Sequence, residues 1–133
     1  MKNITLISIV ALLIVVSGCM PGLNRNTGKD NVMMHAVYFE LNDNSPQLTQ
    51  KLVDDCNKYL SNHPGIKYFS VGTRATEYDR SVNVKDWDVA LHVVFESKEA
   101  HDKYQVADDH HKFIDENKQN WKSVKVFDSL DAE

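Results

Sequence analysis

The chain has 133 residues, which suits one domain, and its 42% hydrophobic and 26% charged residues are typical of a globular protein rather than a disordered or fibrous one. The formal net charge is −4, and the basic residues are scattered along the sequence. Because nucleic-acid binding needs clustered Lys and Arg to neutralise phosphates, this pattern argues against a nucleic-acid partner.

The first residues have the order of a secretory signal. Lys2 precedes an apolar run from Ile4 to Val16, which is shorter than the roughly 20 residues that cross a bilayer. The four residues Val16-Ser17-Gly18-Cys19 resemble the lipobox of bacterial lipoproteins, in which the cysteine is acylated and becomes the new amino terminus. We therefore predict a lipoprotein signal peptide over residues 1–18; an ordinary signal peptide with an incidental cysteine is the alternative.

This signal predicts where the protein resides. Several acyl chains on Cys19 would attach the mature protein stably to a membrane, whereas one chain gives only marginal binding. Residues 19–31 contain Pro, Gly and several Asn without periodicity, and are expected to be a flexible tether. We expect a lipid-anchored, extracytoplasmic protein of the cell envelope, on the periplasmic side if the cell has two membranes. Cys56 is the other cysteine, so no disulfide within the exported domain is expected.

The segment Val32–Leu41 is predicted to be a strand, because it is rich in β-branched and aromatic residues. One of its faces would carry His35, Val37, Phe39 and Leu41, and the other Met34, Ala36, Tyr38 and Glu40.

A helix is predicted after this strand. Ser45 is expected at the N-cap and Pro46 at the first helical position, and the helix should end before Pro64. Cys56 falls on its apolar stripe, where we expect a core residue rather than a nucleophile, because apolar surroundings keep a thiol protonated.

The remaining elements alternate in the same way. Strands are predicted over Ile66–Arg74, Trp87–Glu96 and Trp121–Leu130. Between them we expect a charged loop able to overhang the sheet edge, a helix capped by Ser97 that carries Tyr104, and a further helical turn, over Ala75–Lys85, Ser97–Ala107 and Lys112–Asn120 respectively.

The order strand, helix, strand, strand, helix, strand is that of a ferredoxin-like α+β fold. Two helices can cover only one face of a four-stranded sheet, so the other face would be exposed in a monomer. We therefore expect two subunits to bury it together. His92 is expected on that face, which would also carry Met34, Ala36, Tyr38, Ala90 and Val94.

Several of these residues resemble the stress-responsive dimeric α/β barrel domain family. The resemblance covers Val32 to about Leu130 and rests on His35 in MHAVYFEL, Pro64-Gly65-Ile66 followed by Val71-Gly72, the strand end Val94-Phe95-Glu96-Ser97, Tyr104, His110, and Val126-Phe127-Asp128. It implies that residues 32–130 form a ferredoxin-like subunit, that two subunits close a barrel, and that each subunit holds a cavity between sheet and helices.

The resemblance also implies candidate site residues. In a plant polyketide cyclase of this family the cavity carries a strand histidine, a helix tyrosine and a histidine six residues after it, and His35, Tyr104 and His110 match those places. The family commonly has a second histidine and a proline just before the matched histidine, where this chain has Ala107 and Asp108. Apolar lining is expected from Val37, Phe39, Leu91 and Val93.

The residues permit proton-transfer chemistry only if the chain turns after Tyr104. Six residues of continuous helix amount to about 600° of rotation, so Tyr104 and His110 can share a cavity only if the helix breaks, which Asp108-Asp109 favours. His110 with a pKa near neutrality would then remove a proton next to a carbonyl, and the Tyr104 hydroxyl would bind the enolate oxygen. A nearby carboxylate of Asp108 or Asp109 would raise the pKa of His110.

Our preferred interpretation is a stress-associated module that binds a small apolar or aromatic molecule, with no assigned activity and no cofactor. The alternative is a cyclase-like or isomerase-like enzyme with His110 as the base, and Tyr104 and His35 orienting a carbonyl substrate. A structural interpretation, in which all three residues are hydrogen-bonded within the core, also stands. Metal ligation by His110, His111 and the adjacent aspartates is disfavoured, because adjacent residues rarely point at one ion, and no metal is predicted. His101 is expected to be solvated, on the helix side away from Tyr104.

Overall fold

The structure, a computed structural model, describes residues 31–132. The predicted signal peptide and Cys19 lie outside the described residues. Between Met33 and Leu130 the chain forms four strands, three α-helices and one 3-10 helix. In chain order these are β1 (Met33–Leu41), α1 (Pro46–Leu60), β2 (Ile66–Thr73), β3 (Val89–Phe95), α2 (Lys98–Gln105), α3 (Asp108–Asn117), η1 (Lys118–Asn120) and β4 (Trp121–Leu130).

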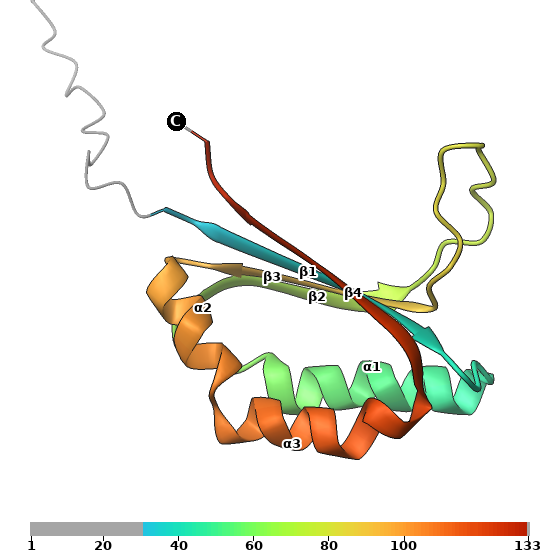
Figure 1. The fold of residues 1–133 in the computed structure, drawn as a ribbon, viewed down its shortest axis with the longest axis horizontal. Coiled ribbons are helices and arrows are strands. Elements are labelled where there is room, and N and C mark those ends of the chain that lie inside the picture. The colour runs from blue at the N-terminus through green and yellow to red at the C-terminus, as the bar shows by residue number, and fades with distance from the viewer. Residues whose placement is uncertain (1–30, 133) are drawn as a thin grey trace, which may run out of the picture.

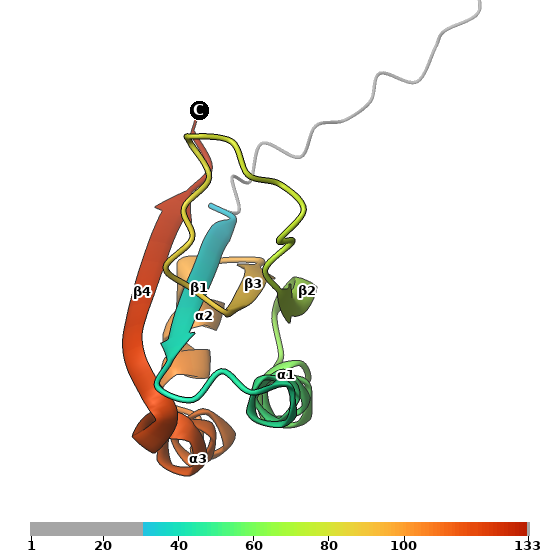
Figure 2. The ribbon, with the colours of Figure 1, turned by 90° about the vertical axis from the view of Figure 1, so that its right-hand side faces the viewer.

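The four strands form one antiparallel sheet in the order β2-β3-β1-β4. Helices α1 and α3 lie side by side beneath one face of this sheet, and α2 closes the space between sheet and helices at one end (Figures 1 and 2). The predicted ferredoxin-like α+β fold is therefore confirmed. None of the helices within residues 31–132 is long and apolar enough to cross a membrane.

The core lies between the sheet and the helices. In β1 every second residue from Met33 to Leu41 is buried, so the predicted division of its two faces is correct. Cys56 of α1 is fully buried, and desolvation raises the pKa of its thiol well above the ordinary range, which supports a core residue. The predicted start of α1 is also correct, although the Ser45 side chain makes no capping hydrogen bond.

The second helical region differs from the prediction. The helix breaks at Val106 and Ala107 as expected, but α3 begins at Asp108 rather than near Lys112. Asp108 and Asp109 therefore lie in the first turn of α3 and not in the loop before it. Carboxylates are favourable there, because the exposed N–H groups of a helix start carry partial positive charge.

Gly65 allows α2 to pack closely on the turn before β2. Its φ is +85°, and a Cβ at this position would lie 2.5 Å from the Cβ of Ala100. Its carbonyl oxygen accepts a hydrogen bond of 2.8 Å from the backbone N–H of Glu96, next to the residue that caps α2. Because only glycine fits both the backbone conformation and the contact, Gly65 is needed for this close approach of α2.

The face of the sheet opposite the helices is apolar and is not covered by any described element. Phe127 is 59% exposed and Met34 48% exposed on this face, and His92 is hydrogen-bonded there to the Tyr38 hydroxyl at 3.2 Å. The loop between β2 and β3 projects from the ends of these two strands toward this side (Figure 1) and carries exposed apolar side chains, among them Val82 and Val84. The loop and the open face together border a hollow of about 430 Å³.

The open face predicts the oligomeric state. We expect a chain that begins at Asn31 to form dimers at micromolar concentration and Phe127→Glu to shift it to monomers, because the substitution places a charge in the buried interface. Sedimentation equilibrium measures this directly. Val106→Glu, at a residue 69% exposed between α2 and α3, is the matched control and should stay dimeric. A wild-type chain that is monomeric under these conditions contradicts the prediction.

Candidate functional site

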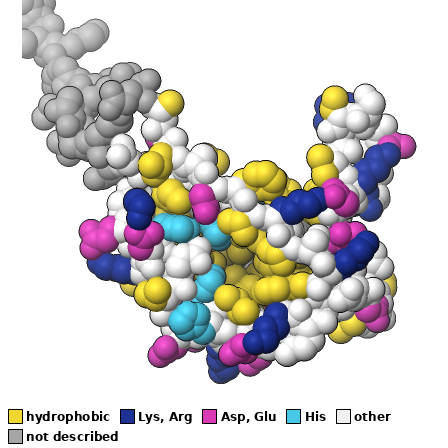
Figure 3. Space-filling model, viewed as in Figure 1, with side chains coloured by type: hydrophobic (Ala, Val, Ile, Leu, Met, Phe, Trp, Pro, Cys, Tyr) yellow, Lys and Arg dark blue, Asp and Glu magenta, His cyan; other side chains and the backbone are white. Residues whose placement is uncertain are grey.

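A cavity of about 200 Å³ lies between the sheet and the helices. Figure 3 shows the molecule from the side on which hydrophobic side chains line a hollow between these layers, with histidines gathered at one end of it. Its walls come from all three α-helices and from β1, β3 and β4. The lining residues are His35, Val37, Phe39, Leu60, Leu91, Tyr104, Gln105, His110, Phe113, Ile114, Trp121, Val124 and Val126.

The three candidate polar residues of the sequence analysis all line this cavity. The ring of Tyr104 lies 5.9 Å from the ring of His35 and 4.8 Å from that of His110, centroid to centroid. The break between α2 and α3 makes the second contact possible, since a continuous helix would place Tyr104 and His110 on different faces.

The apolar candidates divide into two groups. Val37, Phe39 and Leu91 line the cavity as expected, but Val93 does not. Val93 is 1% exposed and belongs to the packed core of the helix-covered face. Its predicted place in the cavity wall is therefore wrong, because a residue on the correct face of β3 can still be covered entirely by other side chains.

Three buried polar atoms of residues that line the cavity have no hydrogen-bond partner among the described residues. They are the Tyr104 hydroxyl, Nδ1 of His110 and Nε1 of Trp121. Buried polar groups in proteins are almost always paired, because an unpaired one loses the hydrogen bonds it would make to water. The structural interpretation, in which the Tyr104 hydroxyl is satisfied within the core, therefore does not describe this site.

His110 is neutral at physiological pH. Burial, and to a smaller extent the neighbouring His35, His111 and His63, together lower the pKa of its imidazole to about 4. The adjacent aspartates do not raise the pKa of His110 as predicted, because their side chains are exposed in the first turn of α3. Burial likewise raises the pKa of the Tyr104 hydroxyl, so this group is present as a neutral donor.

His35 has a carboxylate partner that the sequence analysis did not identify. Its Nδ1 donates a hydrogen bond of 2.6 Å to Oδ1 of Asp128, which lies directly opposite on β4. Burial lowers the pKa of His35, and the bond to Asp128 acts in the opposite direction. Finding this pair from sequence requires the register between two strands that are 93 residues apart.

His101 was predicted to be solvated, and this is wrong. The residue is 8% exposed, and its ring centroid lies 5.1 Å from that of His35. Residues three apart share a face of a helix, so His101 and Tyr104 point to the same side of α2. The three-residue spacing between His101 and Tyr104 was enough to predict that His101 faces the core.

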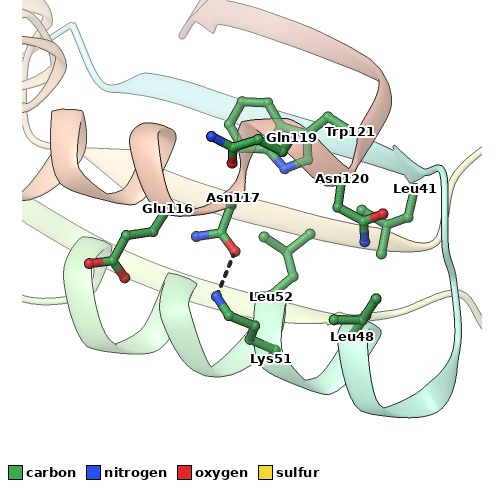
Figure 4. A pocket seen from close by; sticks show the side chains of 9 residues that line it. All are labelled: Leu41, Leu48, Lys51, Leu52, Glu116, Asn117, Gln119, Asn120 and Trp121. Atoms are coloured by element: carbon green, nitrogen blue, oxygen red, sulfur yellow. Dashed lines mark hydrogen bonds between the residues drawn. The ribbon is translucent and has the colours of Figure 1, made fainter.

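A second, smaller hollow of about 120 Å³ lies between α1 and the segment that joins α3 to β4 (Figure 4). Lys51 reaches across it and donates a hydrogen bond of 3.3 Å to Oδ1 of Asn117. Trp121 lines both this hollow and the larger cavity, and so stands between them. Since no histidine lines the smaller hollow, the larger cavity is the better candidate for chemistry.

The chain matches a family profile described as the stress responsive A/B barrel domain over residues 33–131. The match spans most of the sequence, so the protein belongs to this family. No curated protein matches the chain.

Solved structures show the same fold at low identity. A family member from Mesorhizobium loti has a TM-score of 0.65 at 21% identity, over 77% of this chain and 99% of that one. A dimeric ferredoxin-like protein of unknown function from Thermobifida fusca has a TM-score of 0.63 at 16% identity, over 77% and 92%. The hydroxynitrile lyase of Passiflora edulis has a TM-score of 0.63 at 16% identity, over 78% and 96%.

The low pKa of His110 predicts a loss of stability in mild acid. The unfolded chain takes up this proton near pH 6.5, whereas the folded chain takes it up only near pH 4, so the free energy of unfolding falls as the pH drops between these values. His110→Gln removes the imidazole. The loss of unfolding free energy between pH 6.5 and pH 4 should therefore be smaller than in the wild type, by up to about 3 kcal/mol. Urea unfolding at a series of pH values measures the difference.

His111→Gln is the control, because His111 is the exposed neighbour in the sequence. It should retain most of the acid sensitivity of the wild type. Parallel curves of stability against pH for His110→Gln and the wild type would show that His110 is not held neutral.

Proposed function

We propose that the domain binds a small, neutral, mostly apolar molecule that carries one hydrogen-bonding group. The observation that carries this proposal is that two of the three unpaired buried atoms at the cavity, the Tyr104 hydroxyl and His110 Nδ1, belong to neighbouring rings whose centroids are 4.8 Å apart. A carbonyl oxygen of a ligand would accept from the Tyr104 hydroxyl, and a ligand hydroxyl would in addition donate to a neutral imidazole.

The size and charge of the cavity restrict the ligand further. An apolar cavity of about 150 Å³ holds one benzene molecule, so a cavity of about 200 Å³ suits a single ring with a short substituent. No Lys or Arg lines the cavity, and the pKa of about 4 keeps His110 uncharged. A carboxylate or phosphate ligand would therefore lose its hydration without gaining a cation, which disfavours it.

The binding test compares two ligands of nearly equal shape, acetophenone and ethylbenzene. Tyr104→Phe should weaken acetophenone binding roughly fivefold to tenfold, the effect of one hydrogen bond of about 1 kcal/mol, and should leave ethylbenzene binding unchanged. Ligand-observed NMR titrations of both compounds measure this. Tyr59→Phe is the matched control, because the hydroxyl of this buried tyrosine bonds Glu116 and Tyr59 does not line the cavity. Failure of the wild type to bind either compound contradicts the proposal.

A specific contact also favours a second function, proton transfer next to a carbonyl. His35, oriented by its hydrogen bond to Asp128, is a better base in this arrangement than His110, whose pKa of about 4 makes it a weak one. Tyr104 and His110 would then hold the carbonyl oxygen. One protein of similar fold is named a hydroxynitrile lyase, so the fold is compatible with an enzyme.

The same NMR samples distinguish binding from turnover. In deuterated buffer an enzyme of this type exchanges the methyl protons of bound acetophenone, and His35→Gln should stop the exchange while the ligand still binds. Binding by the wild type without exchange above the buffer rate leaves the binding function and removes the enzymatic one.

We also propose that the mature chain is anchored in a membrane of the cell envelope through acylated Cys19. The support is the order of basic, apolar and small residues that ends in Val16-Ser17-Gly18-Cys19. We expect the mass of the amino-terminal peptide from the membrane fraction to equal Cys19 plus its acyl groups. An unmodified or absent Cys19 contradicts the anchor and leaves the cavity proposal untouched.

A further inference from the structure

We propose that His35, His101 and Asp128 form a binding site for a divalent transition-metal ion, with Zn²⁺ as the reference ion. Each of the three residues offers one ligand atom, and the three atoms lie within 4.8 Å of one another. Nδ1 of His35 and Nε2 of His101 lie 2.6 Å and 3.9 Å, respectively, from Oδ1 of Asp128. Among residues 31–132 this is the one group of three such side chains that is close enough to hold an ion.

The donor set suits a transition metal better than magnesium or calcium. Two imidazole nitrogens and one carboxylate oxygen are ligands that Zn²⁺ binds readily, whereas Mg²⁺ and Ca²⁺ prefer oxygen alone. Three protein ligands also leave at least one coordination position open, as in catalytic rather than structural zinc sites.

The three ligands are held by different parts of the fold. His35 and Asp128 are directly opposite each other on β1 and β4, and His101 lies above them on α2. A ligand set assembled from two strands and a helix is preorganised by the core, so binding an ion would order little additional backbone.

His101 is oriented for ligation by its own neighbours. Its Nδ1 donates a hydrogen bond of 3.3 Å to Oδ1 of Asp102. This bond fixes the tautomer in which Nε2 carries the lone pair, and Nε2 is the atom nearer to Asp128. Metal-binding histidines typically donate their other ring N–H to a carboxylate in this way. We therefore assign Asp102 as a positioning residue for the site.

Binding an ion requires only small movements of side chains. Ligand atoms around a tetrahedral Zn²⁺ are about 3.3 Å apart, given metal–ligand distances near 2.0–2.1 Å. The His35–Asp128 pair would open slightly and the His101–Asp128 pair would close slightly. The side-chain amide of Gln105, which donates to Nε2 of His101 at 3.0 Å, would have to rotate away; Gln105 is partly exposed and ends α2.

An ion can reach the site from solvent through its acidic member. The two histidines are 5% and 8% exposed, whereas the side chain of Asp128 is 41% exposed. The site shares His35 with the cavity, but His101 and Asp128 do not line the cavity. Substitution of His101 or Asp128 can therefore test metal binding without changing a residue that lines the cavity.

The test uses the full-length chain, purified in detergent and freed of metal by chelation. We expect isothermal titration with ZnCl₂ to show one site per chain, and Co²⁺ to give the visible absorption bands of a bound, low-coordinate ion. His101→Ala and Asp128→Asn should each weaken Zn²⁺ binding at least tenfold and abolish the Co²⁺ bands. Asp102→Asn should weaken Zn²⁺ binding roughly tenfold and retain the bands, as expected for a positioning residue.

Matched substitutions of exposed residues control for adventitious binding. His111→Ala and Asp131→Asn should leave both signals unchanged. Zn²⁺ binding that persists in His101→Ala and Asp128→Asn overturns the proposal, as does the absence of a site in the wild type. Asp128→Asn changes a partly exposed side chain at the edge of the sheet, so it remains informative if His101→Ala does not fold.

The proposal can fail independently of the cavity function. Tyr104→Phe should weaken acetophenone binding and leave Zn²⁺ binding intact, whereas His101→Ala should do the reverse. A Tyr104→Phe chain that loses Zn²⁺ would show that the metal is held in the cavity and not by the three proposed ligands.

Discussion

The interruption of the helix at Val106 and Ala107 is the constraint on which the cavity depends. It turns the chain between α2 and α3, and so brings Tyr104 and His110 to a ring separation of 4.8 Å. Without it, one straight helix would direct the two rings to different sides. The same turn lets α3 lie beside α1 under the sheet, so that the helix layer covers the core while leaving space at its end for the cavity.

The resulting cavity is uncharged and mostly apolar, with a few unpaired polar atoms in its wall. Desolvation keeps His110 uncharged and Tyr104 protonated, and the carboxylate of Asp128 is hydrogen-bonded to His35. A neutral site with unpaired donors and acceptors discriminates by hydrogen-bond geometry and shape rather than by charge. His35 belongs both to this site and to the group with His101 and Asp128, so it links the polar chemistry of the cavity to a second cluster at its wall.

Much of the fold follows from local patterns. The alternation of apolar residues identified β1 and its faces, β4 has the predicted bounds Trp121–Leu130, and two acidic residues indicated the helix break. Two features of the site were not predicted from the sequence, for different physical reasons. Asp128 becomes a partner of His35 only through a strand register set by the whole sheet, which no local pattern contains. His101, by contrast, was recoverable from its three-residue spacing to Tyr104.

Alternate residues of strand β4 contribute to the two opposite faces of the sheet. Val124, Val126 and Asp128 face the helix side, whereas Phe127 belongs to the open face of the sheet. Because successive residues of a strand point to opposite sides, inserting a single residue just before Val124 would exchange the two sets. The cavity wall, the carboxylate beside His35 and the apolar open face would all change together. A change of length by one residue in this strand would therefore alter both sides of the sheet at once, whereas a substitution alters only one.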